Sequence, residues 1–560
     1  MTTNELLAGL ALPRPAAAPD AGPFDDRLYD LVEVRVRRLF TDNPILATFY
    51  GIHSEDSRLG DASRDAVEAE IAEERAHLAA VEALDPAGLS AAARFERDLE
   101  LHNVRLNLFE TDEVRRWEQR ATAASDIGDA VFLLFARGSA PLAERLERIT
   151  DRVEAVAAYL AQSRTRAVRP QVATWQHVER RFARDLPGLF AEIRATADGV
   201  LGAPELARLD RAIAGASTAL DEYATWLDTT LATATDDWPL GPDRYDHLVG
   251  LRAFDDLDAD AILDIGQEQL RRNLEARRDA ARELYPDDDI ATAIARLKAD
   301  HPATFEEALE AYKVAMGRAR EYLVAHDIVT VPEEPIEVIA TPEYLRSVMP
   351  FAAYFSPARF DADQRGIYIV TPAVDGDPNA MLEHYRASIS NTSIHEAYPG
   401  HHLQLAVAAK HPSLTRMLTE APEFVEGWGM YSEQMMREEG FDAGPAFRMA
   451  MYTDAVWRAC RIILDVRMHR GELTPDEATD FLVEHTSFER ANATAEVRRY
   501  TYTPGYQLSY LLGKVLILGL REEERRRLGP AFRLREFHDT LLRNGSLPIS
   551  FHRRLLRGEG

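Results

Sequence analysis

The sequence predicts a mainly α-helical protein with a small β-sheet, and three observations support this fold class. Long segments carry apolar residues at three- and four-residue spacing with charged residues between them, as helices with one buried face do. Several helical segments begin with proline, which the first turn of a helix tolerates. Short β-branched and aromatic segments bounded by proline or glycine are few and local.

The clearest helical segments are 66–83, 92–109, 141–162, 204–232, 258–285 and 305–325. Pro141, Pro204 and Pro475 stand where a first helical turn accepts proline. The sequence from Thr474 to Glu477 is that of a capping box, in which each of these two side chains satisfies a backbone N–H of the other residue. We expect helices to start close to these residues.

The strand signals lie in three short segments, 336–340, 351–355 and 366–371. They come directly before the histidine-rich motif described below, so we expect a small sheet near that motif. The edge of such a sheet can bind an extended peptide through main-chain hydrogen bonds. A hairpin that only covers the core is the alternative.

The chain shows no internal linker and no repeat of fixed period. We therefore expect one large helical domain over residues 25–560, in one or two lobes. Residues 1–24 are rich in proline and alanine and lack the basic segment of a secretory signal, which predicts a disordered or extended tail.

Composition argues against several classes of partner. The formal net charge of −28 disfavours nucleic acid and anionic membranes as partners, because both attract basic surfaces. A single cysteine, Cys460, cannot form an internal disulfide and fits a reducing compartment. No apolar run reaches membrane-spanning length. We expect a cytoplasmic protein that acts on a small molecule.

The most informative stretch, residues 391–404, holds a modified zinc-hydrolase motif. It places three histidines and a glutamate within eight residues: His395, Glu396, His401 and His402. In the motif H-E-x-x-H, two histidines four residues apart bind zinc, and the glutamate is the general base. Here the fourth position after the first histidine is Pro399, which cannot bind a metal. Without the dipeptide Pro399-Gly400 the motif is regular.

The inserted dipeptide predicts an interruption of the helix between the histidines. Proline lacks an N–H and crowds the carbonyl of His395, four residues back. Gly400 permits a positive φ. His401 is the second ligand of the restored motif, and His402 is the alternative because it shares a helical face with His395. Surface histidines beside a capped helix start are the other interpretation.

A third ligand is expected downstream, in an apolar and helical setting. Glu426 lies among apolar and aromatic residues, where burial of an unpaired carboxylate would be costly. It follows His401 by 25 residues, enough for a second helix to return. Glu433, seven residues later, fits a partner that orients a ligand histidine. An exposed glutamate on a solvated face is the alternative for Glu426.

Residues 456–469 place Arg461, Asp465 and His469 at four-residue spacing on one helical face. This pattern fits a buried network beside the metal, in which His469 is the most relevant side chain. It equally fits a ladder of charges on the surface.

The segment 496–514 concentrates tyrosine and arginine around a Pro-Gly turn. A zinc peptidase needs a donor for the oxyanion, and Tyr510 and Tyr502 are the candidates. A substrate with a free carboxylate needs an arginine fork, for which Arg498 and Arg499 are the candidates. Tyrosines that only pack the start of a helix are the alternative.

With these segments together, the chain resembles the bacterial domain-of-unknown-function family 885, whose signature His-Glu-x-x-Pro-Gly-His-His matches residues 395–402. Further similar segments are 44–53, 426–428, 461–469, 499–500 and 504–513. That family is similar in fold to the helical zinc carboxypeptidases of thermophilic bacteria and, more distantly, to angiotensin-converting enzyme and thimet oligopeptidase. The resemblance implies a gluzincin-like helical body with zinc at the floor of a deep cleft.

The function expected from the motif and the resemblance is a zinc-dependent hydrolase, a metallopeptidase or carboxypeptidase that acts on small peptides. Zn²⁺ is the expected cofactor, with His395, His401 and Glu426 as ligands. Glu396 is the expected base, and Tyr510 or Tyr502 the oxyanion donor. The alternatives are a zinc amidase acting on a non-peptide metabolite and a non-catalytic helical binding protein with a structural or vacant metal site.

Overall fold

The computed structural model describes residues 10–17, 20–341, 346, 352–372, 380–486 and 488–559. The chain divides into two compact units. The first unit comprises Met1–Trp238, Pro357–Gln364 and Pro412–Thr415. The second unit comprises Pro239–Ser356, Arg365–His411 and Arg416–Gly560. Both are built mainly of helices, so the predicted fold class is confirmed.

The first unit consists of helices between residues 25 and 231. They are α2 (Asp25–Asp42), α3 (Pro44–Tyr50), α4 (Arg64–Glu82), α5 (Ala91–Leu108), α6 (Ala123–Ala136), α7 (Leu142–Ser163), α8 (Ala173–Ala197) and α9 (Ala203–Leu231). The side chains of Ser63 and Ser90 cap α4 and α5 by accepting backbone N–H groups of the first turn. Within the predicted tail, residues 10–17 and 20–24 contain neither helix nor strand, and 1–9 and 18–19 lie outside the described residues.

Two short segments from later in the chain belong to the first unit, and each makes a buried or half-buried polar contact with it. His53 bonds Asp361 at 2.5 Å, and Ser413 donates its hydroxyl to Glu96 at 2.5 Å. Hydrogen bonds to Asp361 and then to Asp56 raise the pKa of His53 to about 9. The charged imidazole therefore holds both carboxylates in place.

The second unit contains the remaining long helices. They are α10 (Pro242–Leu251), α11 (Ala259–Leu284), α12 (Ile290–Lys298), α13 (Phe305–Ala325), α14 (Arg386–Glu396), α15 (His401–Ala408), α17 (Pro422–Glu438), α18 (Pro445–His469), α19 (Pro475–His485), α20 (Arg490–Tyr500), α21 (Ser509–Leu528), α22 (Leu534–Arg543) and α23 (Ile549–Leu556). The short α16 (Leu414–Leu418) has residues in both units. Each predicted helical segment ends within two residues of an observed helix boundary, and the capping box at Thr474 is present.

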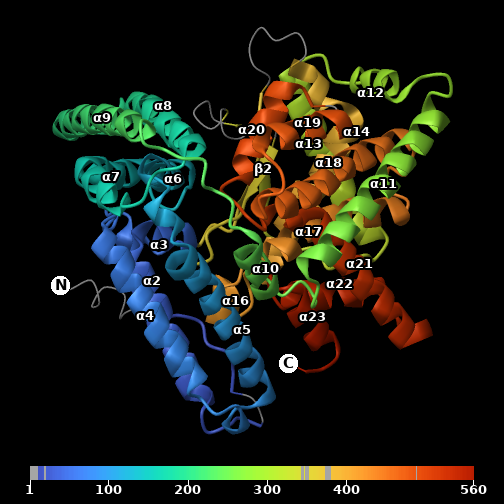
Figure 1. The fold of residues 1–560 in the computed structure, drawn as a ribbon, viewed down its shortest axis with the longest axis horizontal. Coiled ribbons are helices and arrows are strands. Elements are labelled where there is room, and N and C mark those ends of the chain that lie inside the picture. The colour runs from blue at the N-terminus through green and yellow to red at the C-terminus, as the bar shows by residue number, and fades with distance from the viewer. Residues whose placement is uncertain are drawn as a thin grey trace. The chain divides into compact units, whose positions relative to one another are not determined.

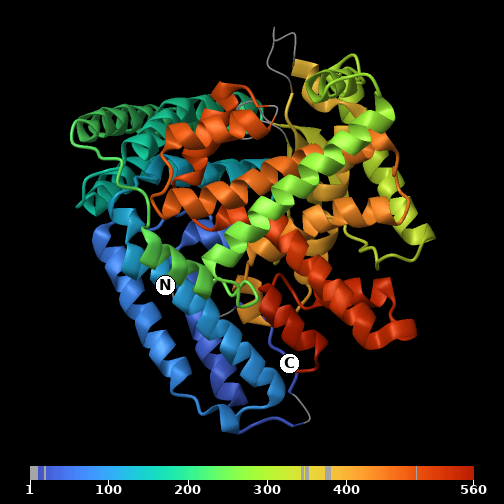
Figure 2. The same cartoon turned by 45° about the vertical axis from the view of Figure 1, so that its right-hand side comes forward.

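Two helix pairs form the centre of the second unit. Figure 1 and Figure 2 show α11 running along α18, and α17 packs along α21. The second pair is in backbone contact: a Cβ on Gly513 would lie 1.9 Å from the carbonyl oxygen of Glu423, and one on Gly427 would lie 2.6 Å from Gly513. Glycine at both positions lets α17 approach α21 closely.

A small sheet lies in the second unit, as predicted. Among the described residues it has three strands in the order β1-β3-β2. Strand β1 (Ile336–Ala340) pairs parallel with the central β3 (Gly366–Val370), and β2 (Ala352–Phe355) pairs antiparallel with it. Residue 351 of the predicted second strand lies outside the described residues. Strand β2 contacts α14, so the sheet adjoins the helix of the histidine motif.

Within the part of the chain that the structure describes, none of the helices combines the length and the hydropathy needed to cross a bilayer.

Candidate metal centre

The helix that carries the histidine motif is interrupted where the sequence predicts. Helix α14 ends at Glu396 and α15 begins at His401. The intervening turn includes a cis Tyr398–Pro399 peptide and is held by hydrogen bonds to α14 and α17. The indole N–H of Trp428 donates to the carbonyl of Pro399 at 2.8 Å, and the N–H of Gly400 donates to the carbonyl of Ile394 at 2.9 Å.

Glycine is required at position 400, but not for the predicted reason. Gly400 has φ −68°, so it does not use the positive φ that glycine permits. A Cβ there would lie 1.7 Å from the carbonyl oxygen of His395. The turn therefore needs glycine because it folds back onto the end of α14, where there is no room for a side chain.

The turn brings His401 beside His395, and α17 supplies Glu426 to both. A nitrogen of each histidine and a carboxylate oxygen of Glu426 all lie within 4.8 Å of one another. The Nε2 atoms of His395 and His401 are 3.5 and 3.6 Å from the same oxygen, Oε2 of Glu426. We call these three residues the His–His–Glu cluster.

The geometry of the cluster suits a zinc ion. Ligand atoms bound to one tetrahedral zinc at about 2.0–2.1 Å lie roughly 3.4 Å from one another. The two nitrogen-to-oxygen distances in the cluster are close to this value. Two histidines and one glutamate are also the ligand set of one class of catalytic zinc site, which keeps a fourth position for water. The residues present therefore fit the metal.

His395 is oriented by a chain of hydrogen bonds from its other ring nitrogen. Its Nδ1–H donates to Oε1 of Glu433 at 2.8 Å, which directs Nε2 toward Glu426. Asn391 donates its amide to the second oxygen of Glu433 at 2.9 Å. Burial by itself would lower the pKa of His395, but its carboxylate partners Glu426 and Glu433 raise the pKa to about 10. Glu433 thus occupies the orienting position that the sequence predicts.

His402, the alternative ligand, is engaged elsewhere. Its Nε2–H donates to the carbonyl of Glu334 at 3.0 Å, and its Nδ1 accepts the hydroxyl of Tyr354 on β2 at 3.0 Å. Burial lowers the pKa of His402 to about 4, so the ring is neutral. With both nitrogens bonded, His402 connects the sheet to α15 and has no lone pair for a metal.

Glu396 ends α14 next to His395. Among the described residues its half-buried carboxyl group has no hydrogen-bond or ion-pair partner. Burial raises its pKa above the ordinary value, and the charge of Glu426 raises it further. A carboxylate of raised pKa without a partner beside the cluster can take up a proton.

A tyrosine that the sequence analysis did not select touches the cluster. Tyr506 donates its hydroxyl to Oε1 of Glu426 at 2.8 Å, and the hydroxyl of Tyr510 lies 3.5 Å from that of Tyr506. Burial, followed by the charge of Glu426, raises the pKa of both tyrosines. Both hydroxyls therefore remain protonated. Tyr502 is half-buried in the turn that follows α20, and its role stays a prediction.

The residues at four-residue spacing on α18 form a buried network, and the surface ladder is wrong. Arg461, Asp465 and His469 are each at most 1 % exposed. Asp465 accepts the hydroxyl of Tyr245 and the N–H of Gly505, both at 2.7 Å. The second bond fixes the turn that leads to Tyr506.

His469 belongs to the same buried network. It donates to the carbonyl of Tyr500 at 3.0 Å and stacks on Tyr245. The two candidate arginines of α20 differ: Arg498 is exposed, whereas Arg499 donates to Glu496 at 2.8 Å.

Gly429 on α17 lies against the ring of His395. A Cβ at this position would lie 2.6 Å from Cε1 and 2.8 Å from Nε2 of His395. We expect Gly429→Ala to displace the imidazole and weaken zinc binding by about 10- to 100-fold, the usual effect of disturbing the groups that orient a ligand. Isothermal titration with zinc measures this effect.

Gly519→Ala on α21 is the matched control, because nothing lies within 4 Å of its Cβ position. This variant should keep its zinc affinity and melt at or slightly above the wild-type temperature, since alanine favours the helix. Equal zinc affinity in both variants would contradict the assignment of His395 as a ligand.

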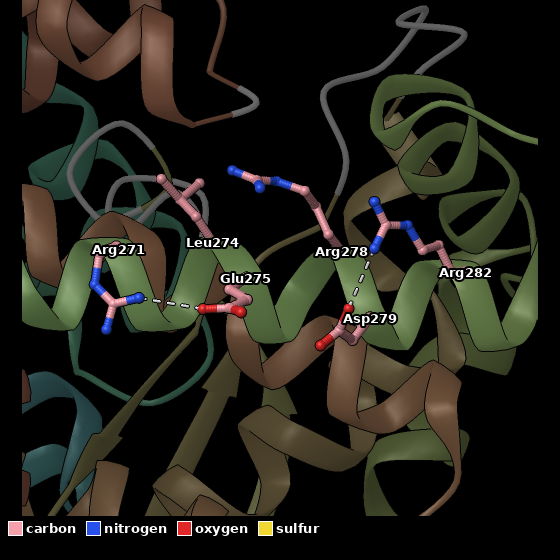
Figure 3. Close-up of a pocket in the computed structure, with 6 residues that line it drawn as sticks. All are labelled: Arg271, Leu274, Glu275, Arg278, Asp279 and Arg282. Atoms are coloured by element: carbon pink, nitrogen blue, oxygen red, sulfur yellow. Dashed lines mark hydrogen bonds and ion pairs between the residues drawn. The ribbon is translucent and has the colours of Figure 1, made fainter.

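A hollow of about 240 Å³ on the surface of α11 does not belong to this centre (Figure 3). It is lined by Arg271, Leu274, Glu275, Arg278, Asp279 and Arg282. Two of its three arginines pair along the helix, Arg271 with Glu275 at 3.2 Å and Arg282 with Asp279 at 3.5 Å. These pairs leave Arg278 as the remaining charged side chain of the lining.

The fold and the His–His–Glu cluster define a mainly helical protein with a candidate metal centre. Residues 44–556 match the model of a family described as "Bacterial protein of unknown function (DUF885)". The chain belongs to this family, which confirms the resemblance to that family found in the sequence. No curated protein matches the chain.

Two solved structures, each described as a "putative lipoprotein", share the fold. The one from Shewanella oneidensis has a TM-score of 0.78 and 22% sequence identity, covering 95% of this chain and 99% of its own. The one from Colwellia psychrerythraea has a TM-score of 0.82 and 19% identity, covering 95% and 98%. At these identities the likeness is one of fold alone.

Proposed function

We propose that this protein is a zinc-dependent hydrolase that cleaves small peptides. The observation that carries the proposal is the His–His–Glu cluster, in which two histidine nitrogens face one oxygen of Glu426 at 3.5 and 3.6 Å. Glu396 follows one of these histidines directly in sequence, and its carboxyl group has no hydrogen-bond or ion-pair partner in the part of the chain that the structure describes. Ligand set, spacing and adjacent base together fit a peptidase site better than a structural one.

Each side chain has a distinct part in the proposed reaction. When bound, zinc polarises a carbonyl and lowers the pKa of a water ligand toward about 7. Glu396 accepts a proton from the attacking water and delivers it to the leaving nitrogen. Glu433 holds the ring of His395 in the orientation that a ligand needs.

Tyr510 is the proposed donor to the oxyanion. The hydroxyl of Tyr506 is committed to Glu426, whereas the hydroxyl of Tyr510 has only a 3.5 Å contact with Tyr506 among the described residues. The raised pKa of Tyr510 keeps its proton available for donation. A positioned donor of this kind is worth about 10²- to 10³-fold in kcat.

The likeness to helical zinc carboxypeptidases is part of the proposal. It rests on the spacing from His401 to Glu426 and on the tyrosine-rich segment 504–513, which holds both Tyr506 and Tyr510. The implied cleft, with zinc at its floor, belongs to the same proposal.

The test uses zinc-loaded protein and two panels of substrates. One panel contains dipeptides to pentapeptides, and the other contains acylated amines without a peptide bond. We expect hydrolysis of peptides, loss of activity with a chelator and recovery with zinc. Activity on the acylated amines alone would replace the peptidase with an amidase. Zinc binding with no hydrolysis of either panel would favour a binding protein with a structural metal.

A further inference from the structure

Two arginines of α18 lie near the His–His–Glu cluster without a hydrogen bond to any described residue. They are Arg458 and Arg461, one helical turn apart. Nε and Nη2 of Arg461 and Nη1 of Arg458 are buried without a hydrogen-bond partner among the described residues. The nearest carboxylate oxygens are 3.7 Å from Arg461, on Glu496, and 3.9 Å from Arg458, on Asp454. These separations are too long for hydrogen bonds.

Aromatic rings surround the guanidinium of Arg461. Its central carbon lies 4.4 Å from the ring of Tyr510, 4.8 Å from that of Trp457 and 5.4 Å from that of Tyr500. Arg458 stacks on Trp457 at 3.7 Å. Ring faces stabilise a cation but accept few of the N–H groups that a guanidinium presents in its plane.

Buried N–H donors without hydrogen bonds destabilise the fold unless a ligand or water accepts from them. A buried charged group without hydrogen bonds loses more free energy than a neutral one. The arginine fork matches a carboxylate in geometry and charge and can bind both of its oxygens. Within ion-pairing distance, the guanidinium groups of Arg458, Arg461 and Arg499 meet only the carboxylates of Asp454 and Glu496 among the described residues.

Tyr510 joins these arginines to the metal centre. One end of the side chain, the hydroxyl, lies 3.5 Å from the hydroxyl of Tyr506, which donates to Glu426. The face of the same ring covers Arg461. The side chain of Tyr510 and the hydroxyl of Tyr506 therefore lie between the guanidinium and Glu426, a span of about one to three residues of extended peptide.

We propose that Arg461, with Arg458, binds the free carboxylate at the carboxyl end of the substrate. The inference rests on the proposed hydrolase function and specifies its substrate class: short peptides with a free carboxyl terminus, cleaved within about three residues of that end. The side chain of Arg458 is 17 % exposed, whereas Arg461 is 1 % exposed. We therefore expect the substrate carboxylate to meet Arg458 first and Arg461 second. Arg499 takes a supporting part, since it is already bonded to Glu496.

The first experiment measures binding without hydrolysis. The probe is 4-phenylbutyrate, compared with its uncharged analogue 4-phenylbutanamide, titrated into the full-length protein in a calorimeter. We expect the carboxylate to bind about 10- to 100-fold more tightly than the amide, and Arg461→Met to remove that preference. Arg467→Met on the same helix is the control and should retain it, because Arg467 is paired with Glu472 at 3.4 Å. Carboxylate binding that survives Arg461→Met would overturn the proposal by placing the anion elsewhere.

The second experiment compares hydrolysis of one peptide as the free acid and as the carboxy-terminal amide. We expect the wild type to prefer the free acid about 10- to 100-fold in kcat/KM, with the difference mainly in KM. Equal cleavage of both forms would overturn the carboxylate site and leave the hydrolase intact. If neither form is cleaved, the proposed hydrolase function is contradicted. The calorimetric titration would then be the test of the carboxylate site at Arg461.

Variants of Arg461 need a folding control. Melting temperature and zinc content are measured for each, and Arg458→Met serves as the second variant because its side chain is less buried. Arg461→Lys should restore part of the preference, since it keeps the charge but not the fork. Equal losses on the free acid and the amide in every variant would identify a structural arginine and contradict the proposal.

Discussion

Replacing Glu396 with glutamine is expected to lower kcat by about 10²- to 10⁴-fold while zinc stays bound. Glutamine keeps the shape of the side chain but cannot accept a proton from water at neutral pH. Glu396 lies outside the His–His–Glu cluster, so the ligand set is unchanged. Steady-state peptide assays measure kcat, and metal analysis of the same sample measures the bound zinc.

Glu426→Gln is the contrasting variant, because it removes a proposed ligand. It should lose zinc together with activity, whereas Glu396→Gln should lose activity alone. Unchanged turnover in Glu396→Gln would rule out this residue as the general base. Loss of zinc in Glu396→Gln would instead place it among the ligands.

The second large effect concerns the two adjacent histidines. We expect His401→Ala to weaken zinc binding by more than the roughly 10- to 100-fold that follows loss of an orienting group, because it removes a ligand itself. His402→Ala should keep zinc, since the ring of His402 bonds to Glu334 and Tyr354 instead. It should melt at a lower temperature, because the buried hydroxyl of Tyr354 and carbonyl of Glu334 lose their partner.

Zinc titration and melting curves of both variants separate these roles. The pair is matched, because the same residue type is replaced at neighbouring positions of one helix. Zinc loss in His402→Ala with zinc retained in His401→Ala would reverse the assignment. It would then require the ring of His402 to leave both of its present partners.

The sequence predicts the helices well because their apolar periodicity is regular. The segments at 204–232 and 305–325 agree with α9 and α13 to within one residue. Each of these helices buries one face against neighbours in its own unit, so local pattern and tertiary packing favour the same structure. The strands are also predicted correctly, because their apolar segments are short and bounded by turn residues.

The sequence could not choose between His401 and His402. That choice depends on the conformation of residues 397–400. They fold back against the end of α14, and Trp428 from α17 bonds to the carbonyl of Pro399. No local pattern encodes such a long-range contact. Proline and glycine predict an interruption, but not its direction.

Tyr506 was missed for a related reason. The segment contains several tyrosines, and only the turn fixed by Asp465 determines which of them reaches Glu426. The burial of Arg461 was likewise open, because four-residue spacing occurs on buried and exposed helical faces alike. Packing against Trp457, Tyr500 and Tyr510 decides it.

The most direct test of the metal centre is the zinc content of the purified protein together with the zinc position from anomalous diffraction. We predict one zinc ion per chain, bound by His395, His401 and Glu426, and a melting temperature that falls when a chelator removes it. Protein that holds no stoichiometric metal and gains no melting temperature from added zinc would contradict the account. A zinc ion bound away from these three residues would contradict it equally.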